Sequence, residues 1–377
     1  MTTEKRGHGL LRWIDQKLGS LILAMLGIFL KIQRVWGVKK PIPSNSYLVV
    51  CFGAIGDLII LTRAVKTFLA DQKVYLACSN LNYSSALLYT DFYAGIESID
   101  LKSPLSIYRV CKKYQINQII DSTQWANIGP IMVGMASLLN TYIITRGFKS
   151  NNRFRCLTYN HIIDHSKDIH EVGNFINLIV GGIKVISNSQ LPELLTDLYH
   201  PRLRKTTRKV LLHLWPAGSR AYLKEWPESN WEKLAHHLVK NGYQVYLSGS
   251  QSDALRTQNF IERSGLPLIN LAGVMDLKSL SEFIQNEIEF AVSVNTGVMH
   301  LLVEAKVPVI GLHGPTNPVR WGPLGSASIS LLPRSGLSAY LHYGFEYPKA
   351  DNLAYALNML SVEQVIDAMT DLPSRDN

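Results

Sequence analysis

The sequence lacks the residues that several common kinds of site require. Its four cysteines, Cys51, Cys78, Cys111 and Cys156, are scattered, with no CxxC pair and no histidine at metal-ligand spacing. This pattern is typical of free thiols in a reducing compartment and argues against a zinc site. The chain also has no G-x-G-x-x-G, no Walker A sequence and no Asp-x-Asp. It therefore carries no strong signal for a dinucleotide, for a P-loop nucleotide or for a metal held by paired carboxylates.

Basic residues outnumber acidic ones most strongly in the N-terminal part of the chain. The net charge is +9, but residues 1–40 hold eight Lys and Arg against two acids, so most of the excess lies in this N-terminal arm. A body that binds nucleic acid is therefore not implied. With 47% hydrophobic and 18% charged residues, the composition is that of a folded protein. A chain of 377 residues is too long for one ordinary core, and two domains are expected.

The N-terminal arm contains a 13-residue run without charge, from Leu18 to Leu30. As a helix this run would be about 20 Å long, short of the ~30 Å hydrocarbon core of a bilayer. Apolar residues at helical spacing extend the stripe upstream and basic residues flank it, which is typical of a helix in the interface of an anionic leaflet. We predict such a helix over residues 8–36, in contact with a membrane surface. A helix packed on the body, or a span completed by its flanks, stays an open alternative.

From residue 44 onward, short apolar runs alternate with segments of helical periodicity. In the first half, strands are predicted at 47–52, 73–78 and 117–121, more weakly at 141–145, and helices at 57–70, 82–90, 104–114 and 127–139. In the second half, strands are predicted at 209–214, 243–249, 266–273, 290–295 and in VPVIGLHGP, and helices at about 228–241, at 277–287 and in TGVMHLLVEAK. This alternation is typical of parallel, doubly wound α/β domains. We expect two Rossmann-like halves facing each other across a cleft, where ligands bind in open α/β sheets.

The first glycine turn delivers a single acid to the end of a buried strand. In YLVVCFGAIGDLIILTRAVKTFL, residues 47–69, the strand meets Gly53 and Gly56, and Asp57 follows directly. A carboxylate on a turn at a strand end has a rigid mount and open access, as a general base requires. The same acid would also suit a helix N-terminus, where it caps backbone N–H groups and meets the dipole. On the residues alone, the capping role is favoured.

Four segments of the chain match, in order and spacing, the pattern of a known family. They are VVCFGAIGDLIILTRAV (49–65), LHLWPAGSRAYLKEWPESNWEKLA (212–235), NLAGVMDLKSLSEFI (270–284) and SVNTGVMHLLVEAKVPVIGLHGPTNPVRWGPLG (293–325). Together they resemble glycosyltransferase family 9, the ADP-heptose:lipopolysaccharide heptosyltransferase family. The resemblance runs from about residue 46 to the C-terminus and leaves the arm outside the pattern. It implies an α/β architecture of the GT-B type, with two facing Rossmann-like domains and parallel sheets.

The resemblance also implies an activity, an inverting sugar transfer that needs no metal and no other cofactor. Asp57 matches the family's general base, and with this match the catalytic role is favoured over capping. The candidate donor-side residues are Gly218, Ser219, Arg220, Lys224, Met275, Asn295, Thr296, Gly297 and His300, the last of which faces the side of Thr296 by its i, i+4 spacing. Lys224 matches a lysine that contacts phosphate, and the strand-to-helix junction at Thr296 and Gly297 would favour a diphosphate. For Met275 and His300 a packing role stays open.

One position departs from the family pattern. Asn295 stands where the family usually has Asp before Thr-Gly, which removes a negative charge beside the donor and leaves the donor's identity open. The resemblance implies ADP-heptose as donor and a lipid-linked glycan such as lipopolysaccharide core as acceptor, at the cytoplasmic face of a bacterial inner membrane. The alternatives are a GT-B enzyme that uses a UDP- or GDP-sugar on another acceptor, and a non-catalytic protein that binds nucleotide sugars.

The expected organisation has five parts. Residues 1–43 form the basic arm, 44–183 the acceptor-side domain with the base, 184–207 a linker, 208–345 the nucleotide-sugar domain, and 346–377 a C-terminal helical segment.

Overall fold

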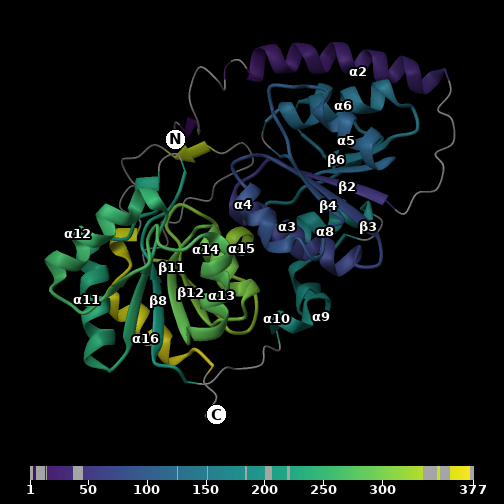
Figure 1. Ribbon diagram of the computed structural model, residues 1–377. Coiled ribbons are helices and arrows are strands. Elements are labelled where there is room, and N and C mark those ends of the chain that lie inside the picture. Colours follow the sequence, from purple (N-terminus) through teal and green to yellow (C-terminus); the bar gives the residue numbers. More distant parts are fainter. Residues whose placement is uncertain are drawn as a thin grey trace. The chain divides into compact units, whose positions relative to one another are not determined.

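The chain divides into two units. The computed structural model describes residues 3–5, 13, 15–36, 46–124, 126–150, 152–182, 185–199, 206–218, 221–333, 346–348 and 357–373. The N-terminal unit is Gly7–Leu191, and the C-terminal unit is Pro192–Asn377 together with Met1–Arg6. Each contains a six-stranded sheet in which every pair of neighbouring strands is parallel (Figure 1). The predicted fold class, two Rossmann-like α/β units with parallel sheets, is confirmed, whereas the five-part division of the chain stays a prediction.

The sheet of the N-terminal unit has the strand order β4-β3-β2-β5-β6-β7. Its strands are β2 (Ser46–Cys51), β3 (Lys73–Cys78), β4 (Gly95–Ser98), β5 (Gln118–Asp121), β6 (Ile144–Phe148) and β7 (His161–Ile163). Counted from β2 this is the order 3-2-1-4-5-6 of a dinucleotide-binding fold. The direction of winding reverses between β2 and β5, so the loops after these two strands part at the carboxyl edge and leave room for a ligand.

Helices cover both faces of this sheet. Two of them, α3 (Ile55–Phe68) and α8 (Glu171–Val180), pack together, as do α5 (Ser106–Tyr114) and α6 (Ile128–Leu139) across the sheet (Figure 1). Because β2 is covered on both faces, its sequence is a continuous apolar run rather than an alternating one. Shorter elements complete the unit: α4 (Tyr83–Ala86), η2 (Leu87–Tyr89), α7 (Arg153–Cys156) and η3 (Asn188–Gln190).

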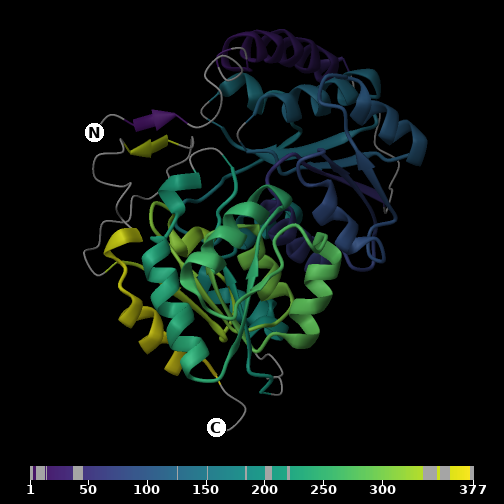
Figure 2. The same ribbon diagram turned by 60° about the vertical axis from the view of Figure 1, so that its left-hand side comes forward.

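The N-terminal arm adds an outer layer to the same unit. A π-helical turn, η1 (Asp15–Gly19), leads into α2 (Ser20–Val35). This helix packs on α6 (Figure 1 and Figure 2) and also contacts α7. The helix predicted over residues 8–36 is therefore present from Asp15 to Val35, and residues 8–12 and 14 lie outside the described residues.

The sheet of the C-terminal unit repeats the same order, β10-β9-β8-β11-β12-β13. Its strands are β8 (Lys209–His213), β9 (Gln244–Ser248), β10 (Ile269–Asn270), β11 (Phe290–Val294), β12 (Val309–Leu312) and β13 (Ser328–Leu331). On one face the apolar core contains side chains from α11 (Glu228–Lys240), α12 (Ala254–Ser264) and α16 (Val362–Thr370). Two helices, α13 (Leu277–Glu287) and α14 (Gly297–Glu304), contact each other on the other face.

Short elements complete the chain. They are α9 (Leu191–Leu194), α10 (Thr196–Tyr199), η4 (Ala221–Lys224), η5 (Gln251–Asp253), α15 (Pro318–Trp321), η7 (Leu357–Met359) and the antiparallel pair β1 (Thr3–Lys5) and β14 (Glu346–Pro348).

Candidate functional site

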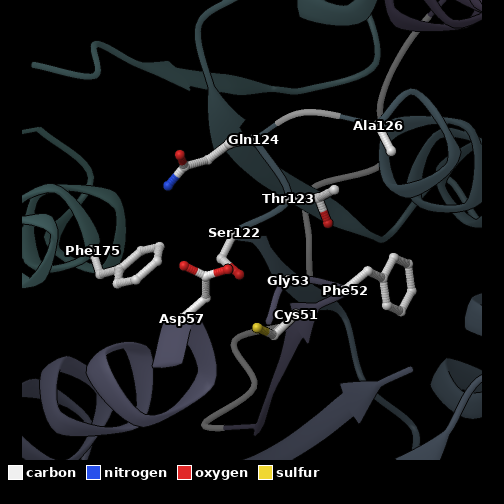
Figure 3. A pocket seen from close by; sticks show the side chains of 9 residues that line it. All are labelled: Cys51, Phe52, Gly53, Asp57, Ser122, Thr123, Gln124, Ala126 and Phe175. Carbon is white, nitrogen blue, oxygen red and sulfur yellow. The ribbon is translucent and has the colours of Figure 1, made fainter. Parts of the chain in front are cut away.

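A pocket opens where the winding of the N-terminal sheet reverses (Figure 3). Its cavity is about 70 Å³ and is lined by Cys51, Phe52, Gly53, Asp57, Ser122, Thr123, Gln124, Ala126 and Phe175. All but Phe175, which belongs to α8, lie at the end of β2, in the loop after it and the first turn of α3, or in the loop after β5. The pocket therefore occupies the place where open α/β sheets bind ligands.

Asp57 stands in the first turn of α3, half-buried, with its carboxylate pointing into this pocket (Figure 3). Its Oδ2 accepts a hydrogen bond of 2.7 Å from the backbone N–H of Ala54, the N-cap residue. Asp57 is thus not the N-cap residue itself, but from the third position of α3 its side chain caps the N–H of that residue. A carboxylate has about four lone-pair positions, so a bond that caps the helix does not prevent it from accepting a substrate hydroxyl. Capping and base catalysis are compatible in this one side chain.

The two turn glycines, Gly53 and Gly56, have different surroundings. A β-carbon on Gly53 would lie 2.5 Å from Oδ2 and 2.8 Å from Cβ of Asp57, so a larger residue would displace the carboxylate. Gly56 is buried within the first turn of α3.

A buried polar network holds the loop after β5. The guanidinium of Arg155 donates to the carbonyl oxygens of Thr123 and of Gln124, the latter at 2.6 Å. Asp121, the last residue of β5, accepts from the Thr123 N–H at 2.8 Å and from the Tyr159 hydroxyl at 2.7 Å. Burial raises the pKa of Asp121, and these hydrogen bonds and the Arg155 charge oppose that rise. The backbone beneath the pocket is therefore fixed from two sides.

The side chain of Gln124 is held by a buried acid that the sequence analysis did not identify. Gln124 Nε2 donates to Glu171 Oε1, whose side chain is fully buried and lies 3.0 Å from His165 Nε2. Asn174 also donates to this carboxylate, at 3.3 Å. Glu171 is in the first turn of α8, where the helix dipole favours an acid. An acid at the start of an apolar helix is the only local signal that could have pointed to it.

In the C-terminal unit, the loop after β8 carries Gly218 and Lys224. Gly218 has φ +94°, a left-handed conformation that favours glycine. Ser219 and Arg220 lie outside the described residues. The Lys224 side chain is largely buried, and its Nζ donates to the Ala217 carbonyl at 3.1 Å. The ammonium thus lies beside the backbone of the glycine turn, and its contact with a diphosphate stays a prediction.

Arg256 of α12 fixes the end of this loop. Its guanidinium donates to both carboxylate oxygens of Glu225, at 2.8 and 2.9 Å, and to Glu228 at 3.1 Å. The same group lies 3.7 Å from the ring centroid of Trp215. Because Glu225 follows Lys224 directly, these contacts restrain the backbone that carries the lysine.

His213, the last residue of β8, was also missed from the sequence. Its Nδ1 lies 2.9 Å from Ser248 Oγ at the end of β9. Burial lowers the pKa of His213 to about 4, so the imidazole is neutral at physiological pH.

The loop after β11 contains three of the predicted donor residues. Thr296 is the N-cap of α14, and its hydroxyl accepts from the Val298 N–H at 3.2 Å, while Gly297 begins the helix. Asn295 Nδ2 donates to the Trp321 carbonyl at 3.1 Å and lies 3.2 Å from His313 Nδ1. An ionised aspartate has no hydrogen to donate to that carbonyl. The amide that departs from the family pattern is therefore fitted to its surroundings in this chain.

Most of the candidate donor-side residues lie at the carboxyl edge of this sheet. Since β8 and β11 are neighbours, the loop with Lys224 and the loop with Thr296 start side by side. His300 is one turn into α14 and largely buried. Met275 follows β10, two strands from β8, and is partly exposed. Among the residues that the structure describes, no group of three or more His, Cys, Asp or Glu side chains could hold a metal ion.

Comparison with known proteins gives one family. The model of glycosyltransferase family 9 (heptosyltransferase) matches residues 131–343. The chain is 35% identical over 122 residues to lipooligosaccharide heptosyltransferase 2 of Haemophilus influenzae, covering 31% of this chain and 34% of that protein. It is 32% identical over 127 residues to lipopolysaccharide heptosyltransferase 1 of Pseudomonas aeruginosa, covering 32% and 33%. The chain thus spans about a third of the length of the curated relatives it matches.

Solved structures resemble the chain over most of its length. One is the E. coli ADP-heptose lps heptosyltransferase II, with a TM-score of 0.66, 16% identity, and coverage of 86% of this chain and 98% of that one. Another is E. coli heptosyltransferase WaaC with ADP, with a TM-score of 0.59, 18% identity, and coverage of 86% and 99%. At these identities the likeness shows the fold.

Proposed function

Since the chain belongs to glycosyltransferase family 9, we propose that it is an inverting glycosyltransferase. It moves a sugar, with heptose favoured, from a nucleoside-diphosphate sugar to a lipid-linked glycan such as lipopolysaccharide core. The observation that carries this proposal is the Asp57 carboxylate in the pocket at the switch point of the N-terminal sheet. This is a residue of the type and setting that an acceptor hydroxyl needs as its base.

Asp57 acts on the acceptor. Its carboxylate takes the proton of the acceptor hydroxyl as that oxygen attacks the anomeric carbon, and the bond from this carbon to the diphosphate breaks. Attack on the face opposite the leaving group inverts the anomeric configuration. Gly53 leaves the space in which the carboxylate stands, and the Ala54 N–H fixes its orientation. A base held in this way needs little reorganisation when the proton moves.

The C-terminal unit binds the donor. The diphosphate gains negative charge as it leaves, and the Lys224 ammonium together with the first N–H groups of α14 would stabilise it. Arg256 restrains the loop that carries Lys224 by pairing with Glu225. Gly297 at the start of α14 permits close approach of the backbone to a phosphate.

ADP-heptose is the favoured donor, because solved relatives are described with ADP and with ADP-2-deoxy-2-fluoro heptose. Thermal shift measurements with ADP-, UDP- and GDP-sugars test this choice. A rise in melting temperature confined to the ADP compounds supports it, since a ligand bound only by the native state stabilises that state. A rise with UDP- or GDP-sugars alone would replace the donor but leave the reaction class.

We also propose where the enzyme works. An acceptor that is lipid-linked is confined to a surface, and the enzyme would act as a peripheral protein at the cytoplasmic face of a bacterial inner membrane. Residues 8–36 would contact that membrane.

A further inference from the structure

The helix α2 has one side committed to the N-terminal unit. Its residues Leu23, Leu26, Gly27 and Leu30 are buried. A β-carbon on Gly27 would lie 2.8 Å from Cβ of Leu157, so the helix backbone lies close to the segment after α7. This side is a packed interface of the fold.

Polar contacts tie the same side down at both ends. Near the start of α2, Asn152 Nδ2 donates to Ser20 Oγ at 3.0 Å. Near its end, Gln33 Nε2 donates to the Leu138 carbonyl at 2.9 Å, and Arg34 donates to the Leu157 carbonyl at 3.1 Å. The segment Asp15–Val35, 21 residues, is long and apolar enough to cross a membrane. A helix that crossed a membrane would lose these contacts and its packing on α6. The position of α2 in the structure is therefore incompatible with a transmembrane span.

The opposite side of α2 exposes a continuous apolar stripe. Its residues lie at the spacing of one helix face, and each is about half exposed or more: Leu21, Met25, Ile28, Phe29, Ile32 and Val35. Trp13 and Trp36, 59% and 87% exposed, stand beyond the two ends. Soluble monomers rarely expose a large contiguous apolar patch unless a partner covers it.

The charge around the stripe indicates which partner covers it. Lys17 and Lys31 are exposed near its two ends, and the first 40 residues carry eight basic side chains against two acids. An apolar face edged by cations, with tryptophans at its ends, matches the boundary between acyl chains and anionic headgroups.

The start of this helix is joined to the pocket that holds Asp57. Both carboxylate oxygens of Asp15 accept from the Asn127 backbone N–H, at 3.0 and 3.2 Å, and Asn127 Nδ2 donates to the Asp15 carbonyl at 2.8 Å. Asn127 follows Ala126, which lines the pocket. Gly19 lies against Asn127 as well, since its β-carbon would be 3.1 Å from Cβ of that residue.

We propose that the outer face of α2 is an in-plane docking surface for an anionic lipid bilayer, and that Asp15 holds the Asp57 pocket at a fixed position relative to that surface. The helix keeps its inner side on α6 while its outer side enters the headgroup region. The docking itself does not depend on the reaction, whereas the role of Asp15 rests on the proposed function.

Vesicle flotation tests the docking. Full-length protein should float with vesicles of phosphatidylethanolamine and phosphatidylglycerol, and binding should fall about tenfold or more when Leu21, Met25 and Phe29 are all changed to Gln. The matched control changes three exposed apolar residues of the C-terminal unit, Leu255, Val274 and Met359, to Gln and should float normally.

Charge and orientation have their own readouts. Lys17→Gln and Lys31→Gln should each weaken binding about fivefold, and Lys240→Gln and Lys278→Gln should not. Alkaline carbonate should release the bound protein. Resistance to carbonate would show that the helix spans the bilayer, and equal flotation of the triple variant would place the membrane contact elsewhere. If wild-type protein forms a dimer that the triple variant does not form, a second copy of the chain covers the stripe. Each of these results overturns the proposal.

Asp15→Ala tests the link to the pocket. It should float normally and bind ADP normally, but raise KM several-fold for acceptor embedded in vesicles relative to acceptor in detergent, with kcat little changed. Asp15→Asn keeps an oxygen for the Asn127 N–H and should restore the wild-type ratio. An unchanged ratio in Asp15→Ala would remove the link. Absence of transfer by wild-type protein on both acceptors, with flotation intact, would instead contradict the proposed function and leave the docking standing.

Discussion

Gly53 and Asp57 share one small space, since a β-carbon on the glycine would lie 2.5 Å from Oδ2 of the aspartate and 2.8 Å from its Cβ. The aspartate Cβ is fixed to α3 and cannot move away alone. We therefore expect Gly53→Ala to turn the carboxylate out of place and to reduce turnover about 10²-fold, with ADP affinity unchanged. Steady-state kinetics and calorimetry measure the two effects. Wild-type turnover in Gly53→Ala would show that the position of the carboxylate is not critical.

Asp57→Asn separates the two roles of this side chain. The amide oxygen can still accept from the Ala54 N–H, so the free energy of unfolding should change by less than about 1 kcal/mol. Turnover should fall about 10²- to 10⁴-fold because the amide cannot take a proton. Asp57→Ala is the control, which should lose about 1 kcal/mol of stability in addition. If Asp57→Asn is fully active and Asp57→Ala loses only stability, the residue is a cap alone.

Lys224→Ala tests the donor-side charge. If the ammonium meets the diphosphate, ADP should bind about 1.5–3 kcal/mol more weakly while adenosine binding stays near wild type. Lys240→Ala, an exposed lysine of the same unit, is the matched control. Equal weakening of ADP and adenosine would indicate that Lys224 acts only by holding the Ala217 turn.

His213 gives a prediction for pH. The folded protein holds its pKa at about 4, below the ordinary value of 6.5, so between these values the unfolded chain binds a proton that the folded chain does not. Wild-type stability should therefore fall as the pH drops from 6.5 toward 4, by up to about 3 kcal/mol from this residue. Urea unfolding of wild type and His213→Asn at several pH values isolates the effect. Parallel stability curves for the two proteins would exclude a depressed pKa.

The strands near the centre of each sheet were predictable, and the edge strands other than β10 were not. The strand predicted at 73–78 coincides with β3, because a strand buried on both faces has a continuous apolar sequence. The short edge strands β4, β7 and β13 lack such a run. The strand predicted at 266–273 was too long, since β10 covers only two residues. The helix predicted at 82–90 is instead the short α4 followed by the 3₁₀ turn η2.

Among the described helices of eight residues or more, α8 and α12 escaped prediction, for opposite reasons. In α8 the buried side includes Glu171, Asn174 and Asn177, whose polar groups are satisfied by contacts that a sequence does not show. In α12 only Thr257 and Phe260 are buried, so the apolar stripe is too thin to recognise.

Some residues of the candidate site could be predicted from the sequence and others could not. Asp57 could be found because its strand, turn and helix are contiguous in the sequence. Gln124 and Glu171 are 47 residues apart, and Asp15 and Asn127 are 112 apart, so only the folded chain brings these pairs together. The structure also shows that the helix of the arm packs on the body and exposes apolar residues on its other side, while its contact with a membrane stays a prediction.

Mass spectrometry of the reaction product tests the central claim most directly. Purified protein is incubated in EDTA with ADP-heptose and a lipid-linked acceptor, beside Asp57→Asn. We expect the acceptor to gain the mass of one heptose residue with wild-type protein and to gain almost none with the variant. The new linkage, read by NMR, should have the anomeric configuration opposite to that of the donor. Equal product from Asp57→Asn, retention of configuration, or no transfer from any nucleoside-diphosphate sugar that the protein binds would contradict an inverting transferase with Asp57 as its base.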